Sequence, residues 1–239
     1  MAQALALLHQ PGTSDVVESV IAIGAVLLGV DGLALSLLTT DEASELMWCT
    51  DERTGRFEDL QFTLGEGPGP EAVRNRAMVW APDLAEVRSD RWPALAAEAS
   101  GTGVRAVFCF PMGVGVIRVG VLTALRHTPG TLTPGQTGDA LALAAALTAH
   151  ILQGDTPQTD AARSADFPPA LHRAVVHQAT GMLSVQLSLT LPKALLRLRA
   201  HAYGSGRSLT DTAQDIVDRR LRLDHAGPPP TVTDKDGSP

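Results

Sequence analysis

Apolar residues recur with the spacing of a helix at both ends of the first long segment of the chain. They do so over residues 14–29 and again over residues 134–153, where Thr133 is a candidate N-cap before Pro134. Between these helices, apolar and β-branched runs predict strands over residues 32–39, 45–51, 78–83, 106–114 and 116–127. Short helices are expected within residues 67–76 and 92–103. The pattern therefore predicts an α+β fold, a largely antiparallel sheet with helices at its edge and across one face.

The pattern of residues 168–223 is different, because it has the helical period throughout. It predicts a small all-α domain of three helices: one that starts at residues 168–169, one over residues 191–203, and one that follows Ser208 as its cap. Their expected buried residues are Leu171, Val175, Ala179, Met182 and Leu183, then Leu191, Ala194, Leu195, Leu198 and Ala202, then Leu209, Ala213, Ile216 and Val217. Gly181 lowers helix propensity in the first of these helices, so we expect another backbone to approach it closely.

Proline and glycine divide the chain into its parts. Residues 12–153 form the first predicted domain, and residues 168–223 form the second. Between them, the polar segment 154–167 is predicted to be a linker. Residues 224–239 are rich in proline and glycine and are predicted to be a disordered tail.

Charge separates the same two parts. The whole chain has a formal net charge of −7, yet residues 1–169 carry −10 and residues 170–225 carry +4. The basic segment also contains the only tyrosine of the chain, Tyr203. Such an asymmetry indicates that one part binds something that the other does not.

Four motifs of the first part resemble the GAF sensory domain. They are "LGEGPGPEA" (64–72), "VWAPDL" (79–84), "GVRAVFCFPM" (103–112) and "VGVLTALRHTPGTLTPGQ" (119–136), within a resemblance that covers about residues 12–152. The loop "GEGPGP" is not followed by Gly-Lys-Ser/Thr, so it is interpreted as a tight turn and not as a phosphate cradle. Gly69 stands where similar domains often carry a cysteine, which weakens any case for thiol chemistry there.

The basic face of the second part has two interpretations. Lys193 and Arg197 are four residues apart on one strip of a helix, Arg199 and Tyr203 are four apart on the next strip, and Arg207 lies at the start of the third helix. Cations beside an aromatic platform are typical of single-stranded RNA recognition. A solvated helix face would have the same composition.

A resemblance favours the RNA interpretation. "QATGML" (178–183), "KALLRLRAHA" (193–202) and "RSLTDTAQDIV" (207–217) look like the ANTAR domain, a three-helix RNA-binding module. The resemblance implies binding of paired RNA hairpins that prevents a transcription terminator from forming. Thr180 stands where the family usually has lysine or arginine, so we expect that contact to be weakened, lost or mediated by water. The candidate RNA-binding residues are Arg173, Gln178, Thr180, Lys193, Arg197, Arg199, Tyr203 and Arg207.

These observations predict a one-component antitermination regulator without enzymatic activity. The GAF-like domain is expected to sense a small-molecule signal, to dimerise, or both. Tandem RNA stem-loops predict a homodimer, with helix 134–153 and the first helix of the second domain as dimer elements. The longest apolar run, residues 20–30, is too short to span a membrane, and no Lys or Arg precedes Arg53 as a signal peptide would require, so we expect a cytoplasmic protein.

Two other functions and a metal site are weaker alternatives. A DNA-binding regulator would need base-reading cations where the third helix begins "SLTDTAQD", and Asp211, Asp215 and Asp218 instead predict a solvated acidic face. A GAF-type methionine sulfoxide reductase would need cysteines, and the chain has only Cys49 and Cys109, which are more typical of strand core residues. His172 and His177 lack a carboxylate to complete a metal set.

The sequence requires no cofactor and leaves the ligand of the sensor domain unknown. Haem, a metal or a cyclic nucleotide would need a pocket, for which the candidate lining residues are Trp48, Cys49, Trp80, Phe108, Cys109 and Met112. Ordinary core packing explains the same residues equally well.

Overall fold

The computed structural model describes residues 6–8, 14–39, 44–153 and 169–223, and it divides into two compact units. The first unit ends at Arg173 and the second begins at Ala174. The predicted linker 154–167 and the predicted tail 224–239 lie outside the described residues.

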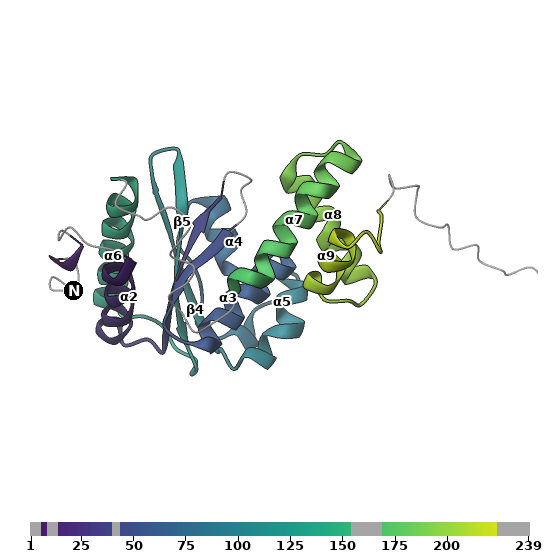
Figure 1. Cartoon of the computed structure of the whole chain (residues 1–239). Helices are drawn as coiled ribbons and strands as arrows, with labels where there is room; N and C mark the ends of the chain where they lie inside the picture. Colours follow the sequence, from purple (N-terminus) through teal and green to yellow (C-terminus); the bar gives the residue numbers. More distant parts are fainter. Residues whose placement is uncertain (1–5, 9–13, 40–43, 154–168, 224–239) are drawn as a thin grey trace, which may run out of the picture. The chain divides into compact units, whose positions relative to one another are not determined.

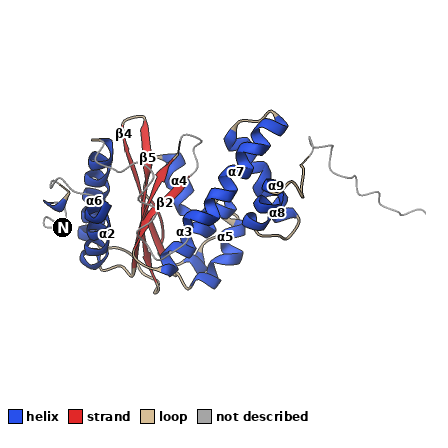
Figure 2. Cartoon of the chain, in the orientation of Figure 1, coloured by secondary structure: helices blue, strands red, loops and turns tan. Residues whose placement is uncertain are grey.

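The first unit is built on a five-stranded sheet whose neighbouring strands are all antiparallel (Figure 2). The strand order is β2-β1-β5-β4-β3, so β2 and β3 form the edges. The strands are β1 (Gly32–Leu38), β2 (Ser44–Cys49), β3 (Val79–Ala81), β4 (Ala106–Val114) and β5 (Ile117–Arg126). Together with the helical second unit, this sheet confirms the predicted fold class.

Helices cover both faces of this sheet, which corrects the expectation that they lie at its edge and across one face (Figure 1). One face packs against α2 (Ser14–Leu28) and α6 (Pro134–Leu152). The other packs against α3 (Glu52–Leu64), α4 (Pro68–Asn75) and α5 (Pro93–Glu98), with short 3-10 turns at Leu84–Glu86 and Ala99–Thr102. Alternation along β4 serves both layers, because Phe108 and Phe110 face the first and Val107 and Cys109 face the second.

Helix α3 was not predicted from the sequence. Asp51 caps it by accepting hydrogen bonds from the backbone N–H groups of Arg53 and Thr54 at 2.8 and 3.0 Å. Its buried face mixes apolar and polar residues, namely Thr54, Gly55, Phe57, Glu58, Gln61 and Phe62. Because half of this face is polar, the hydrophobic period that usually indicates a helix is missing.

The second unit contains three helices, α7 (Pro169–Leu187), α8 (Leu191–Gly204) and α9 (Leu209–Val217). Each helix is followed by a residue with positive φ: Ser188 at 51°, Gly206 at 64° and Arg219 at 60°. The core of this unit is aliphatic and consists of Val176, Ala179, Leu183, Leu187, Ala194, Leu195, Leu198, Ala202, Leu209, Ala213, Ile216 and Leu223.

Several expectations for this unit were wrong in detail. Val217 in α9 is half-buried and not buried, and the side chain of Leu171 lies outside the described residues. Helix α7 buries Val176 and Leu187 fully, whereas Val175 and Met182 are half-buried, so its buried stripe is rotated from the predicted one. Leu191 is 38% exposed because it begins its helix at the edge of the core. Outside its own helix, a Cβ on Gly181 would meet no described atom within 4 Å, so no other part of the described backbone approaches it.

Candidate functional site

Tyr203 is an exposed aromatic residue of the second unit. Its side chain is 74% exposed in the last turn of α8. It is also the only aromatic residue between Ala174 and Leu223, and the core of the unit is complete without it. A tyrosine that contributes nothing to the core is available for stacking on a planar ligand.

Three cationic residues lie on the same helix as Tyr203, and Arg199, four residues before it, is its neighbour on the helix surface. Lys193 is exposed, and Arg197 and Arg199 are half-buried. Since α8 buries Ala194, Leu195, Leu198 and Ala202, helical geometry places these cations on the remaining faces.

Leu196 lies on the same helix as Tyr203, and it was not identified from the sequence as a candidate binding residue. It is 64% exposed and lies seven residues before Tyr203, so the two side chains share one face of α8 and are about two helical turns apart. Arg199 comes between them, three residues after Leu196 and four before Tyr203. An apolar residue out of phase with the buried stripe was the signal that could have identified it.

Arg207 lies at the C-terminal end of the same helix. Its backbone N–H donates to the carbonyl of Ala202 at 2.9 Å, and its guanidinium donates to Asp215 at 2.5 Å. Gln178 is exposed on α7. We call the exposed side chains of Lys193, Leu196, Tyr203 and Arg207, together with the half-buried side chains of Arg197 and Arg199, the α8 surface.

Thr180 and Arg173, two of the candidate RNA-binding residues, are buried. Thr180 is 1% exposed, and its hydroxyl donates to the carbonyl of Val176 at 2.7 Å. Arg173 is 3% exposed and donates to Oδ1 of Asp59 at 2.6 and 2.9 Å, while its guanidinium lies 4.6 Å from the ring centre of Phe62. Neither residue is therefore included in the α8 surface.

The first unit contains a buried polar cluster instead of an exposed one. Glu58 accepts hydrogen bonds from the Ser36 hydroxyl at 2.9 Å and from Nε2 of Gln61 at 3.0 Å. Burial raises the pKa of Glu58, although hydrogen bonds from Ser36 and Thr123 oppose this effect. No sequence pattern indicated this cluster, because it depends on the unpredicted helix α3.

The same cluster explains the loop "GEGPGP". Oε1 of Gln61 accepts a hydrogen bond from the N–H of Gly69 at 2.8 Å. A Cβ on Gly67 would lie 2.7 Å from Oε1 of Gln61, and Gly67 has a φ of 130°. The glycines therefore let the loop pack on Gln61. The backbone N–H of Gly69, which a phosphate would need as a donor, is already bonded to the Gln61 side chain.

Both cysteines are held as thiols. Burial, with the nearby carboxylates of Asp51 and Glu58, raises the pKa of Cys49 to about 11. Burial also raises the pKa of Cys109 well above its ordinary value. Cys49 is in β2 and Cys109 in β4, with β1 and β5 between them, so strand spacing places them too far apart for a disulfide.

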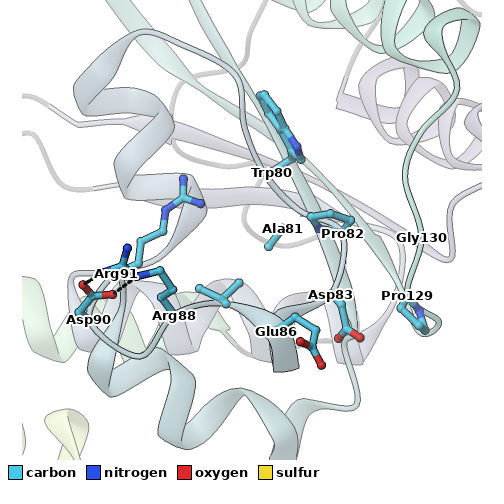
Figure 3. Close-up of a pocket in the computed structure, with 11 residues that line it drawn as sticks. Trp80, Ala81, Pro82, Asp83, Glu86, Arg88, Asp90, Arg91, Pro129 and Gly130 are labelled. Carbon is cyan, nitrogen blue, oxygen red and sulfur yellow. Dashed lines mark hydrogen bonds and ion pairs between the residues drawn. The ribbon is translucent and has the colours of Figure 1, made fainter.

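An open hollow of about 840 Å³ lies beside β3 (Figure 3). Trp80, which is 51% exposed, lines it together with Pro82, Val87 and Pro129. Much of the charge around it is paired, since Arg88 bonds Asp90 at 2.6 Å, and Asp83 bonds Arg105, which does not line the hollow, at 2.7 Å.

The six residues that the sequence suggested as the lining of one pocket do not line a single pocket. Of those six, Trp80 is the one that lines the hollow. Trp48, Phe108 and Met112 pack in the core on the α2 and α6 side, and Cys109 packs on the opposite side of the sheet. Among the described residues, no group of His, Cys, Asp and Glu could hold a metal ion, and no helix is both long and apolar enough to cross a membrane.

Comparisons with known proteins agree with this division. The family model described as "ANTAR domain" matches residues 170–217. The GAF domain of an Acinetobacter phosphoenolpyruvate-protein phosphotransferase is similar in structure, with 13% identity, 64% of this chain and 90% of that chain covered, and a TM-score of 0.51. The free methionine-R-sulfoxide reductase of Neisseria meningitidis, solved with its substrate, has 14% identity, 63% and 85% coverage, and a TM-score of 0.50. No curated protein matches the chain.

The chain thus combines a GAF-like fold in its N-terminal part with an ANTAR domain at residues 170–217. The first and second units are called the GAF-like unit and the ANTAR unit below. At these identities the structural neighbours establish the fold of the GAF-like unit and leave its ligand undetermined.

Proposed function

We propose that this protein is an antitermination regulator that binds tandem RNA stem-loops through the α8 surface of its ANTAR unit. The observation that supports this most directly is Tyr203, an exposed aromatic residue on a helix that also carries Lys193, Arg197 and Arg199, in a unit whose described core contains no aromatic residue. Looped-out bases stack on Tyr203 and pack against the apolar side chain of Leu196, while the cations bind phosphates.

RNA loops suit this surface better than duplex DNA. The third helix begins with Leu209, Thr210 and Asp211, so its N-terminal turn offers no cation for reading base edges in a major groove. The aromatic and basic residues lie along α8, where they form a stacking platform and not a recognition-helix tip. The protein acts in the cytoplasm, where nascent transcripts are accessible.

A homodimer presents two α8 surfaces to two hairpins. The GAF-like unit offers a suitable interface on α2 and α6, whose outward apolar residues are Ile23, Val26, Leu27, Leu141 and Leu152, each 38% to 79% exposed. Linking two modest loop sites in one dimer raises affinity through effective concentration. A small molecule that binds the GAF-like unit changes the geometry or population of this dimer.

The thiols argue against the reductase alternative. Nucleophilic attack on a sulfoxide needs a reactive cysteine, and thiolate forms poorly when burial and nearby carboxylates raise the thiol pKa as they do for Cys49. The loop of residues 65–70 contains no cysteine.

The experiment is a salt-titrated gel shift with the full chain. The probes are a tandem hairpin RNA, its single-hairpin form and a duplex DNA of equal length. Tyr203→Ala is compared with the matched control Val185→Ala, which truncates another apolar side chain, 85% exposed on α7. We expect the tandem RNA to bind best, and Tyr203→Ala to weaken that binding by about tenfold or more, since one stacked base contributes about 1–3 kcal/mol.

Two results contradict the proposal. One is equal binding of duplex DNA and tandem RNA by the wild type. The other is an equal effect of Tyr203→Ala and Val185→Ala on RNA affinity, which makes the α8 surface an ordinary solvated face.

A further inference from the structure

Asp215 binds two arginines that come from opposite ends of α9. Its Oδ2 accepts from Arg207, which precedes the helix, at 2.5 Å. Its Oδ1 accepts from Nε and Nη2 of Arg220, which follows the helix, at 2.8 and 2.7 Å. Arg220 also bonds Asp218 at 2.6 Å, so two arginines and two aspartates form one cluster without net charge.

The backbone brings both arginines to Asp215 in the same way. Helix α8 ends in a turn in which Gly206 has positive φ and the next residue, Arg207, donates its N–H to the carbonyl of Ala202. Helix α9 ends in a matching turn, in which Arg219 has positive φ and Arg220 donates its N–H to the carbonyl of Asp215 at 2.7 Å. Each arginine therefore follows a helix C-terminus, where the helix dipole also favours a cation.

The side chain of Asp215 is not needed for this backbone geometry. The main-chain carbonyl of Asp215 holds the turn, through the N–H groups of Arg220 and Leu221 at 2.7 and 3.0 Å. The carboxylate instead holds the guanidinium groups, and it is 20% exposed while Arg207 is 41% and Arg220 60% exposed. This corrects the expectation of a solvated acidic face at Asp215. The bonds from Arg207 and Arg220 also lower the pKa of Asp215, so it stays ionised.

We propose that Asp215 is a specificity-determining residue of the RNA-binding surface, which keeps Arg207 and Arg220 in a neutral cluster and so prevents them from binding nucleic-acid backbone indiscriminately. This inference rests on the proposed function. An arginine whose charge is neutralised by a carboxylate contributes little to long-range attraction of phosphate. It still has unused N–H donors, which contact an RNA loop only when other residues position that loop.

The test compares Asp215→Asn with Asp211→Asn in the full chain. Asp211 is exposed in the first turn of the same helix, so its substitution removes the same charge and releases neither arginine. Binding is measured by fluorescence anisotropy for the tandem hairpin RNA and for an unrelated single-stranded RNA over a series of salt concentrations. Circular dichroism checks that both variants keep the helical content of the wild type.

We expect Asp215→Asn to bind the unrelated RNA about tenfold more tightly than the wild type, and its preference for the tandem RNA to fall accordingly. The salt dependence becomes steeper by about 0.7 for each arginine that gains a phosphate. Asp211→Asn changes the unrelated affinity by less than about threefold and leaves that slope unchanged. In an Arg207→Ala, Arg220→Ala background, Asp215→Asn has no further effect on the slope, because no arginine remains to be released.

Equal behaviour of the two aspartate variants, or an unchanged salt slope for Asp215→Asn, overturns the inference. Both outcomes leave the proposed function intact as long as the wild type prefers the tandem RNA. Failure of the wild type to bind that RNA contradicts the proposed function itself, so the two failures are distinguishable.

Discussion

The two units of this chain place their aromatic and polar side chains in opposite ways. The GAF-like unit buries Phe57, Phe108, Phe110 and Trp92, and it also buries the carboxyl side chain of Glu58. The ANTAR unit buries aliphatic residues and leaves its only aromatic residue, Tyr203, exposed. Its buried polar side chains in the described range, Thr180 and Thr212, bond only to carbonyls of neighbouring backbone.

This difference separates two kinds of chemistry. In the ANTAR unit the groups able to recognise a ligand lie on the surface of a simple core, as binding an extended polymer such as RNA requires. In the GAF-like unit the polar groups are enclosed between the sheet and α3, where their protonation and packing affect the stability of the whole unit. Substitutions of these polar and aromatic side chains should therefore act on stability in the first unit and on binding in the second.

The largest expected effect is that of Gly120→Ala in the GAF-like unit. A Cβ at this position would lie 2.1 Å from the carbonyl oxygen of Ser36 and 3.0 Å from the Cα of Leu37, so β1 and β5 would have to separate. We expect the unit to lose about 3 kcal/mol of unfolding free energy. Urea unfolding followed by tryptophan fluorescence measures this, because all three tryptophans lie in the GAF-like unit. A loss below about 1 kcal/mol contradicts the tight pairing of these strands.

The second effect concerns the buried carboxyl group of Glu58. Because burial raises the pKa of Glu58, the folded unit holds its proton more tightly than the unfolded chain does. Its contribution to stability is therefore greatest below the ordinary glutamate range and decreases as the pH rises toward the folded pKa. Glu58→Gln removes this decrease. We therefore expect the free energy of unfolding of the variant to exceed that of the wild type by at least about 1 kcal/mol near pH 8, and to equal it near pH 4.

Unfolding titrations of both proteins at several pH values measure this difference. Ser36→Ala is a useful comparison, since it removes a hydrogen bond to the carboxylate and keeps the charge. A variant less stable than the wild type at every pH contradicts the assignment of Glu58 as a carboxyl with a raised pKa.

Gly181→Ala repeats the first substitution in the other unit, with the opposite sign. Beyond the local backbone of α7, no atom of the described residues lies within 4 Å of the added Cβ, and the residue is helical. We expect a gain of about 1 kcal/mol in the stability of α7, because alanine has the higher helix propensity. Hydrogen exchange of the α7 amides measures this gain. Faster exchange in the variant contradicts the conclusion that a Cβ fits at this position.

The smallest effect concerns the thiols. Because burial and nearby carboxylates raise the pKa of Cys49 to about 11, we expect it to react with a thiol reagent at least about tenfold more slowly in the folded chain than in the unfolded one. Cys109 is fully buried and should react only after unfolding. Rapid labelling of either thiol in the native protein would reopen the reductase alternative.

Local patterns in the sequence were sufficient for much of this protein. Hydrophobic periods identified the sheet, both long helices of the GAF-like unit and the three helices of the ANTAR unit, because each of these elements buries a regular apolar face. The charge asymmetry and the single tyrosine indicated the α8 surface. These features are readable because they depend on residues close together in the chain.

Only the tertiary structure decided the remaining features. Helix α3 has a half-polar buried face, and its hydrogen bonds to Ser36 and Gly69 join positions far apart in the sequence. Arg173 and Thr180 are buried, although their residue types suggested exposed contacts. Asp215 pairs with two arginines because two helix ends bring them to it from both sides. A residue's partners across space determine its exposure and charge state, and no local pattern contains them.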